Sequence, residues 1–138
     1  MKNGFCEQLS WKELNLSPIR QLIKLAKAED MRGIALNRKL NKFGDVTTRS
    51  LVGMQRGQAA IVAREPMVIS GLPLIQPILD IYGKDCRFKA LQKDGSFVQA
   101  GTSLGYIKGP SKTLLSAERI ILNFIQRLSG IASHTKTY

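Results

Sequence analysis

The stretch that decides the fold is LLSAERIILNFIQRLSGIAS, residues 114–133. Its apolar residues recur every three or four positions, which is the spacing of one face of an α-helix. These residues are Leu114, Ala117, Ile121, Phe124, Ile125 and Leu128. Ser111, just upstream, is of a residue type preferred at helix N-caps. The stretch therefore predicts a long amphipathic helix that buries one face and has Ser111 as its N-cap.

A polar strip runs along the same predicted helix. Its members are again three and four positions apart, so they line one side. They are Ser116, Arg119, Asn123, Gln126 and Gly130. Periodicity alone favours a solvated face, because most polar helix faces are only that. The alternative is that the forked donors of Arg119 hold a planar carboxylate or a phosphate.

Residues 58–110 predict a β layer. Short apolar or alternating runs are separated by Glu65-Pro66, by the turn dipeptide Asp94-Gly95 and by other glycines. The runs are AAIVAR (59–64), MVIS (67–70), CRFKALQ (86–92), FVQAG (97–101) and SLGYIKGP (103–110). Because the turn signals lie between neighbouring runs, we expect a layer rich in hairpins.

Two further helices flank this layer. Ser17-Pro18 resembles an N-cap followed by a first-turn proline, and predicts a short amphipathic helix over about residues 18–28. A second helical period begins after Gly71 and is closed by Gly83. Residues 32–56 carry a local net charge of +5 without apolar periodicity and predict an exposed loop. Together these elements predict an α+β fold that ends in a long helix.

Composition limits the class of protein. The 138 residues fit one ordinary folding unit, and 43% hydrophobic with 22% charged residues is a globular composition. The formal charge of +11 implies an anionic partner or a strongly positive site.

The cysteine and histidine content disfavours a disulfide framework and structural zinc, because only Cys6, Cys86 and His134 are present and the two cysteines are far apart. No apolar signal region or membrane span is visible, so a cytoplasmic protein without membrane contact is expected.

Five segments in a fixed order carry a resemblance to a known family. They are GDVTT (44–48), IVARE (61–65), the Gly71 after VIS, DGSFVQAGTSLGYIKGP (94–110) and the helix at 114–133. Together they resemble carboxylating nicotinate-nucleotide diphosphorylase, also called quinolinate phosphoribosyltransferase. In that family the helix contains an Ala-Glu-Arg triplet, then Leu-Asn-Phe, then Gln-Arg-Leu-Ser-Gly-Ile-Ala. Each motif is weak alone, but the set covers most of the chain.

The resemblance implies an enzyme of NAD biosynthesis. It would join quinolinate to phosphoribosyl pyrophosphate, forming nicotinate mononucleotide and releasing pyrophosphate and carbon dioxide, with Mg²⁺ accompanying the pyrophosphate. The family's subunits have a mixed α/β N-terminal domain followed by an incomplete α/β barrel. They assemble as dimers in which one N-terminal domain covers the other subunit's barrel. The arginine of the Ala-Glu-Arg triplet, here Arg119, reaches the partner's substrate carboxylates and is the one substrate-binding residue assigned.

The sequence also departs from the family pattern. The Asp-Thr-Arg-Lys-Thr stretch, the His-Arg pair and the later lysine and acidic residues that bind substrates and metal do not occur in residues 1–138. We therefore expect an N-terminal α+β domain at 1–110 and a linking helix with the start of a truncated barrel domain at 111–138. We expect such a chain to be inactive alone. Mg²⁺ would be bound by residues that are not in this chain. The partner would be a second copy in a homodimer or a complementary C-terminal barrel chain.

Several other polar residues are interpreted as structural. His134 stands where the family more often has an apolar residue and is expected at the surface, and the basic segment 31–43 is interpreted as a surface insertion. No catalytic role is assigned to any of Asp45, Thr47, Thr48, Arg64, Glu65, Lys112 and Arg127. These residue types more often cap turns or form ion pairs than act as ligands.

Two other classes of function remain as alternatives. DGSFVQAGTSLGYIKG also resembles the hairpins of biotinyl and lipoyl carrier domains, but the methionine-flanked turn lysine of those binding modules is missing. A nucleic-acid-binding domain is suggested by the basic segment 32–56. It is disfavoured because Phe43 is the only aromatic residue there and no recognition motif is present.

Overall fold

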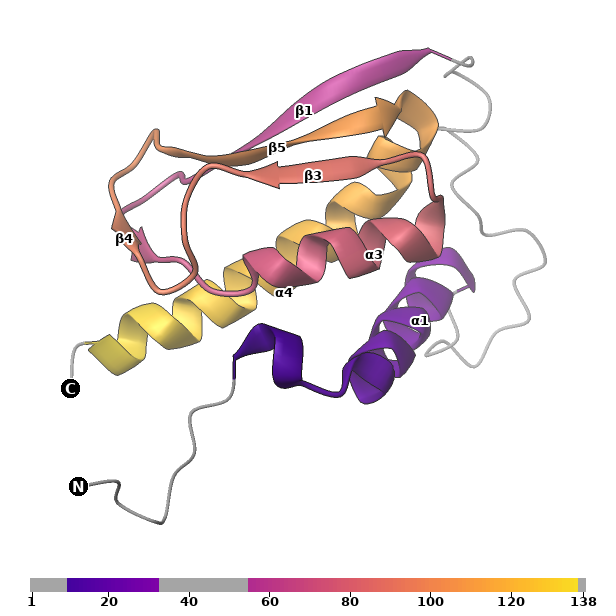
Figure 1. Ribbon diagram of the computed structural model, residues 1–138. Helices are drawn as coiled ribbons and strands as arrows, with labels where there is room; N and C mark the ends of the chain where they lie inside the picture. Colours follow the sequence, from indigo (N-terminus) through magenta and orange to yellow (C-terminus); the bar gives the residue numbers. More distant parts are fainter. Residues whose placement is uncertain (1–9, 33–54, 137–138) are drawn as a thin grey trace.

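The computed structural model describes residues 10–32 and 55–136 of the protein. Figure 1 shows helices gathered on one side of a small β-sheet, with the long helix α4 lying beneath it. The helical elements are η1 (Trp11–Glu13), α1 (Leu16–Arg32), η2 (Leu72–Leu74), α3 (Ile75–Tyr82) and α4 (Ser111–Lys136). The strands are β1 (Arg56–Val62), β2 (Met67–Val68), β3 (Arg87–Ala90), β4 (Phe97–Val98) and β5 (Ser103–Pro110). The α+β class with a long last helix is therefore confirmed.

Some predictions concern residues outside these ranges. They are those for Cys6, for most of the basic segment 32–56 and for GDVTT at 44–48. None of the helices in the described ranges is both long and apolar enough to cross a membrane.

The strands form two antiparallel sheets, and their pairing differs from simple hairpins. One sheet has the order β1-β5-β3 and the other pairs β2 with β4, so no ladder joins strands that are consecutive in sequence. The turn at Asp94-Gly95 forms as expected, with a φ of 84° at Gly95. It is bound to the end of β2, because the Gly95 N–H donates to the Ile69 carbonyl and the Ile69 N–H to the Ser96 carbonyl, at 2.7 and 2.9 Å. These bonds draw β4 away from β3 and onto β2.

The hydrophobic core lies between the three-stranded sheet and helices α3 and α4. The stripe predicted on α4 faces it: Ala117, Ile121 and Ile125 are buried, and the other members pack against them. Four other elements, β1, β5, η2 and α3, contribute the buried apolar residues Ile61, Leu104, Ile107, Leu72, Leu74, Ile75, Ile78 and Leu79. Burial of this surface is the main stabilising term of such a fold.

Two helix boundaries differ from the sequence prediction. α1 begins at Leu16, and the side-chain Oδ1 of Asn15 accepts the Ser17 N–H at 3.0 Å, so Asn15 and not Ser17 caps the helix. Ser111 is the first residue of α4 rather than the residue before it, and its N–H donates to the Gln55 carbonyl at 2.9 Å. α4 also continues through Gly130 to Lys136, because a single glycine weakens a helix without ending it.

Asp94 ties the turn after β3 to the start of the helical layer. Its two carboxylate oxygens accept the N–H groups of Gly71 and Leu72, each at 2.8 Å. Gly71 has a φ of 102°, and a Cβ there would lie 2.7 Å from Cδ1 of Leu128 on α4. The positive φ favours glycine at this position, and the methyl group of Leu128 on α4 would have to move to admit a Cβ.

α1 is docked by the burial of Ile23 in the core and by contacts of one lysine with α3. Lys27 Nζ donates to the Ile81 carbonyl at 2.8 Å and lies 4.3 Å from the centroid of the Tyr82 ring. Burial lowers the pKa of Lys27. The hydroxyl of Tyr82 is buried and has no hydrogen-bond partner among the described residues. Burial, and then the nearby charge of Asp30, raise the pKa of Tyr82 to about 12.

Tyr82→Phe is expected to stabilise the protein by about 1 kcal/mol at neutral pH, because it removes a buried hydroxyl that has no partner among the described residues.

Tyr82 also makes the stability of the fold sensitive to alkaline pH. Between its ordinary value near 10 and about 12 the unfolded chain ionises while the folded tyrosine stays neutral, so stability falls as pH rises through that range. The measurement is the free energy of unfolding in urea of the parent and of Tyr82→Phe, from pH 8 upward. If the stability of the two proteins changes with pH in the same way, the role of Tyr82 is contradicted.

Gly109→Ala is expected to destabilise the fold by about 2 kcal/mol or more, because a Cβ at Gly109 would overlap Sγ of Cys86 and lie 3.0 Å from its Cα. Gly130→Ala is the matched control. Gly130 lies inside α4 with nothing within 4 Å of its added Cβ, so alanine there should stabilise by about 0.5–1 kcal/mol. Thermal unfolding should show a lower melting temperature for Gly109→Ala and a higher one for Gly130→Ala. A higher melting temperature in both variants would contradict the packing described at Gly109.

Candidate functional site

The polar strip predicted on α4 lies at the surface. Arg119, Asn123, Gln126 and Gly130 are exposed, and Ser116 is half-buried. A shallow depression of about 380 Å³ follows the strip. It is lined by Leu115, Glu118, Arg119, Leu122, Asn123 and Gln126. The sequence therefore located an accessible strip in which a cation and two amides can donate hydrogen bonds.

Arg119 is held by a carboxylate from another helix. Its Nη1 lies 3.0 Å from Oδ1 of Asp30, which stands near the end of α1. The Arg119 side chain is 76% exposed, whereas that of Asp30 is 18% exposed. Sequence analysis missed Asp30, because the two residues are 89 positions apart and no local pattern links them.

A larger groove opens beside the strip, between α4 and strand β1. Its volume is about 470 Å³, and it shares four residues with the depression: Leu115, Glu118, Leu122 and Gln126. Most of the rest of its lining is apolar, from Ala59, Ile61 and Val62 on β1 and Ile107 on β5, with Arg64 as the cation. The two hollows therefore form one continuous surface along the side of α4 that carries Arg119.

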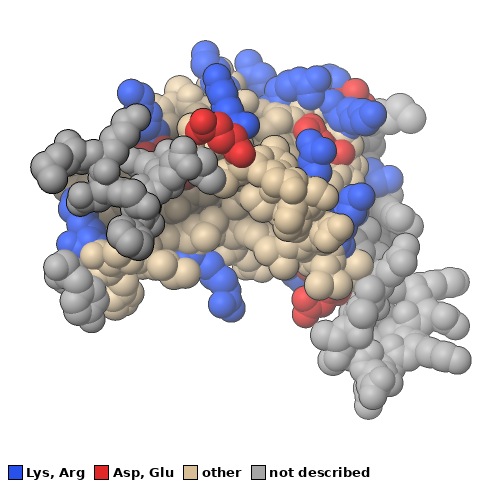
Figure 2. Space-filling model, turned by 60° about the horizontal axis from the view of Figure 1, so that its bottom comes forward, with Lys and Arg blue, Asp and Glu red and all other residues tan. Residues whose placement is uncertain are grey.

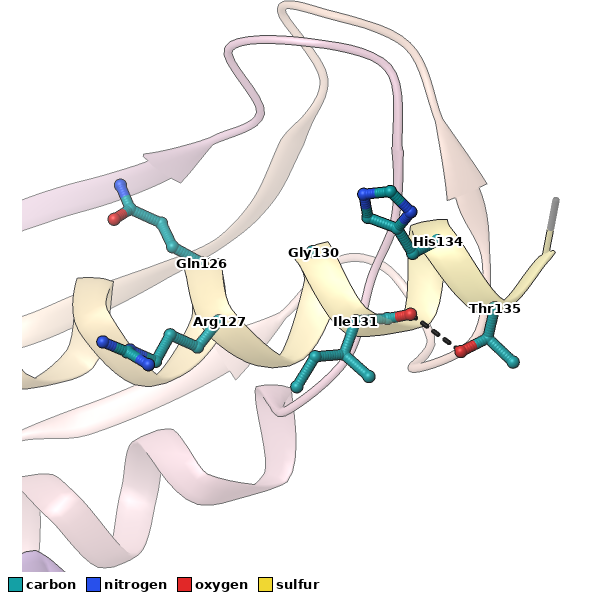
Figure 3. A pocket seen from close by; sticks show the side chains of 6 residues that line it. All are labelled: Gln126, Arg127, Gly130, Ile131, His134 and Thr135. Atoms are coloured by element: carbon teal, nitrogen blue, oxygen red, sulfur yellow. Dashed lines mark hydrogen bonds between the residues drawn. The ribbon is translucent and has the colours of Figure 1, made fainter.

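A third hollow lies over the last turns of α4 and is less suited to bind a ligand. Like the depression along the strip, it is lined by residues of α4 alone: Gln126, Arg127, Gly130, Ile131, His134 and Thr135. Figure 3 shows the Gln126 and His134 side chains on one side of the helix and those of Arg127 and Ile131 on the other. The Thr135 hydroxyl donates to the Ile131 carbonyl at 2.9 Å. These groups do not converge, and His134 is a surface residue, as expected.

The described residues offer no cage for a metal ion. Within residues 10–32 and 55–136, no group of three or more His, Cys, Asp or Glu side chains is placed to hold one. Mg²⁺ prefers oxygen ligands; both carboxylate oxygens of Asp94 accept backbone N–H groups, and Oδ1 of Asp30 is bonded to Arg119. The expectation that residues outside this chain bind Mg²⁺ stays a prediction.

On the helical side of the molecule, positive charge does not gather at one point. Figure 2 brings forward the helical side of the molecule, where uncharged residues fill the middle and Lys and Arg lie mostly around the edge. Lys112 and Arg127 are both exposed on α4, as are Arg64 and Glu65 after β1. None of these four makes a salt bridge within the described part of the chain. Arg119 thus differs from them in having a partner that fixes its position.

Comparison with known proteins connects these features to one family. A sequence model described as "Quinolinate phosphoribosyl transferase, N-terminal domain" matches residues 45–129, more than half of the chain. A probable nicotinate-nucleotide pyrophosphorylase [carboxylating] of Bacillus subtilis is 34% identical over 113 residues, which are 77% of this chain and 39% of that protein. The chloroplastic nicotinate-nucleotide pyrophosphorylase [carboxylating] of Arabidopsis thaliana is 32% identical over 119 residues, 86% of this chain and 32% of that protein.

Solved structures agree with the sequence relatives. The nicotinate-nucleotide pyrophosphorylase of Francisella tularensis superposes with a TM-score of 0.76 at 27% identity, over 92% of this chain and 41% of that one. NadC of Streptococcus pyogenes gives a TM-score of 0.77 at 29% identity, over 88% of this chain and 41% of that one. The chain thus spans about two fifths of the length of these solved relatives. Because both the sequence model and the superposed structures cover most of it, this chain belongs to the quinolinate phosphoribosyltransferase family, of which it forms the N-terminal domain.

Proposed function

We propose that this chain acts as the N-terminal part of a quinolinate phosphoribosyltransferase. The reaction joins quinolinate to phosphoribosyl pyrophosphate and yields nicotinate mononucleotide, pyrophosphate and carbon dioxide for NAD biosynthesis. The observation that carries the proposal is the position of Arg119, which belongs to the matched family segment and lies exposed on α4 beside a continuous groove. Its role is to bind the carboxylates of quinolinate.

The chemistry of the substrate suits this residue. Quinolinate is a planar dicarboxylate, and a guanidinium group offers five N–H donors in a fixed plane that matches a carboxylate edge. Lysine would supply the charge without that geometry. Asp30 takes one donor atom of Arg119, Nη1, in the bond described above. The rest of the guanidinium can therefore face a bound anion.

The remainder of the catalytic apparatus is proposed to lie outside residues 1–138. In this proposal, residues 1–110 form the N-terminal domain and residues 111–138 lead into the barrel domain of the family. The other arginine, lysine, histidine and acidic groups come from that barrel, in a homodimer or a complementary chain. Mg²⁺, when bound there, neutralises charge on the pyrophosphate. The assembly is proposed to act in the cytoplasm.

Arg119→Ala is expected to raise the KM for quinolinate by about 10- to 100-fold in the active assembly, because a charge-assisted hydrogen-bonding pair is lost. The KM for phosphoribosyl pyrophosphate should change far less. Lys112→Ala is the control, since it removes one positive charge from the same helix without touching the strip. Steady-state assays of nicotinate mononucleotide formation provide the measurement. An unchanged quinolinate KM in Arg119→Ala would remove the role assigned to Arg119.

The polypeptide of residues 1–138 is expected to show no transferase activity on its own, because the family's Asp-Thr-Arg-Lys-Thr stretch and His-Arg pair do not occur in these residues. Nicotinate mononucleotide formation is assayed with this polypeptide alone and again with the polypeptide encoded immediately downstream. Activity that appears only with both supports the proposal. Turnover by residues 1–138 alone would contradict it.

A further inference from the structure

Asp30 is the described group that contacts the Arg119 side chain from outside α4. The carboxylate reaches Nη1 of Arg119 at 3.0 Å from helix α1. The pair is asymmetric, because Asp30 is half-buried at 18% exposure while Arg119 is 76% exposed. A half-buried carboxylate on α1 thus contacts a long, exposed side chain on α4.

The position of Asp30 is itself fixed by α1. Ile23 on that helix is fully buried in the core, and Lys27, one turn before Asp30, donates to the Ile81 carbonyl at 2.8 Å. The amine of Lys27 also lies 4.3 Å from the Tyr82 ring centroid. α1 is therefore attached to α3 at the level where Asp30 projects toward α4.

An exposed arginine without a partner samples many rotamers and loses that freedom when it binds a ligand. A fixed carboxylate restricts those rotamers before the ligand arrives, and such preorganisation increases affinity. The opposite effect is competition, because Asp30 and a bound carboxylate both attract the same cation. The single bond to Nη1 leaves a second, bidentate edge of the guanidinium for the ligand, so the geometry favours preorganisation.

We propose that Asp30 is a positioning residue, which holds Arg119 in the orientation that receives a carboxylate of quinolinate. This inference rests on the function proposed above and extends it to a residue of α1 that lies outside the matched segment 45–129. Asp30 touches neither substrate nor reacting atoms. Asp30 therefore affects the affinity for quinolinate and leaves the rate of the chemical step unchanged.

The test uses the active assembly with Asp30→Ala, Asp30→Asn and Asp30→Glu. Because an exposed ion pair is a weak interaction, Asp30→Ala should raise the KM for quinolinate by about two- to fivefold. The kcat and the KM for phosphoribosyl pyrophosphate should stay unchanged. Asp30→Asn should fall between Asp30→Ala and the parent, and Asp30→Glu should recover most of the affinity. Glu29→Ala, at the exposed neighbouring position on α1, is the control and should behave as the parent.

A double-mutant comparison with Arg119→Ala separates the two proposals. Asp30→Ala should have no further effect on quinolinate KM once Arg119 is absent, and calorimetric titration with quinolinate should give the same pattern. If Arg119→Ala itself leaves quinolinate KM unchanged, the proposed function fails and the role of Asp30 fails with it. If Arg119→Ala weakens quinolinate use but Asp30→Ala leaves it unchanged or improves it, only the positioning role is overturned. Equal losses for both substrates, with a lowered melting temperature, would also overturn it.

Discussion

The direct continuation of strand β5 into helix α4 is the constraint on which the rest of the structure depends. β5 is the central strand of the three-stranded sheet and ends at Pro110, and α4 begins at Ser111 with no loop between them. The joint is held by the Ser111 N–H bond to the Gln55 carbonyl and by the contact between Gly109 and Cys86, which leaves no room for a side chain. The direction of α4 beneath the sheet is therefore determined at its first residue. Arg119 lies about two turns further along α4, so its position along the helix axis follows from the rise of about 1.5 Å per residue.

The salt bridge between Asp30 and Arg119 acts on geometry more than on stability. Exposed ion pairs of this kind contribute about 0–1 kcal/mol, because water screens the attraction and ordering two side chains costs entropy. α1 is held to the core instead by the burial of Ile23 and by the Lys27 contacts with α3. The same pair can still matter for a ligand, since the orientation of one guanidinium decides whether a planar carboxylate meets one donor or two.

Local patterns in the sequence predicted the parts of this fold that local physics determines. The apolar stripe and the polar strip of α4 followed from helical spacing, and Asp94-Gly95 formed the turn that its residue types favour. What local patterns could not predict depends on contacts between distant segments. The pairing of β4 with β2 arises from hydrogen bonds at Ile69, and the carboxylate beside Arg119 comes from 89 residues earlier. The exposure of Arg119 was thus predictable, whereas its partner was not.

The openness of the candidate site has a consequence for how it can work. The depression is open to solvent, the groove beside it is floored in part by the core residues Ile61, Ile107 and Ile121, and Arg119 is 76% exposed. Two unit charges 4 Å apart attract by about 1 kcal/mol in bulk water, but by about 4 kcal/mol where the effective dielectric constant is near 20. A carboxylate bound to Arg119 on this open surface would therefore be held weakly. Under the proposed function, a second surface that covers α4 excludes water and strengthens the same bond without any change in this chain, so quinolinate binding and assembly become coupled.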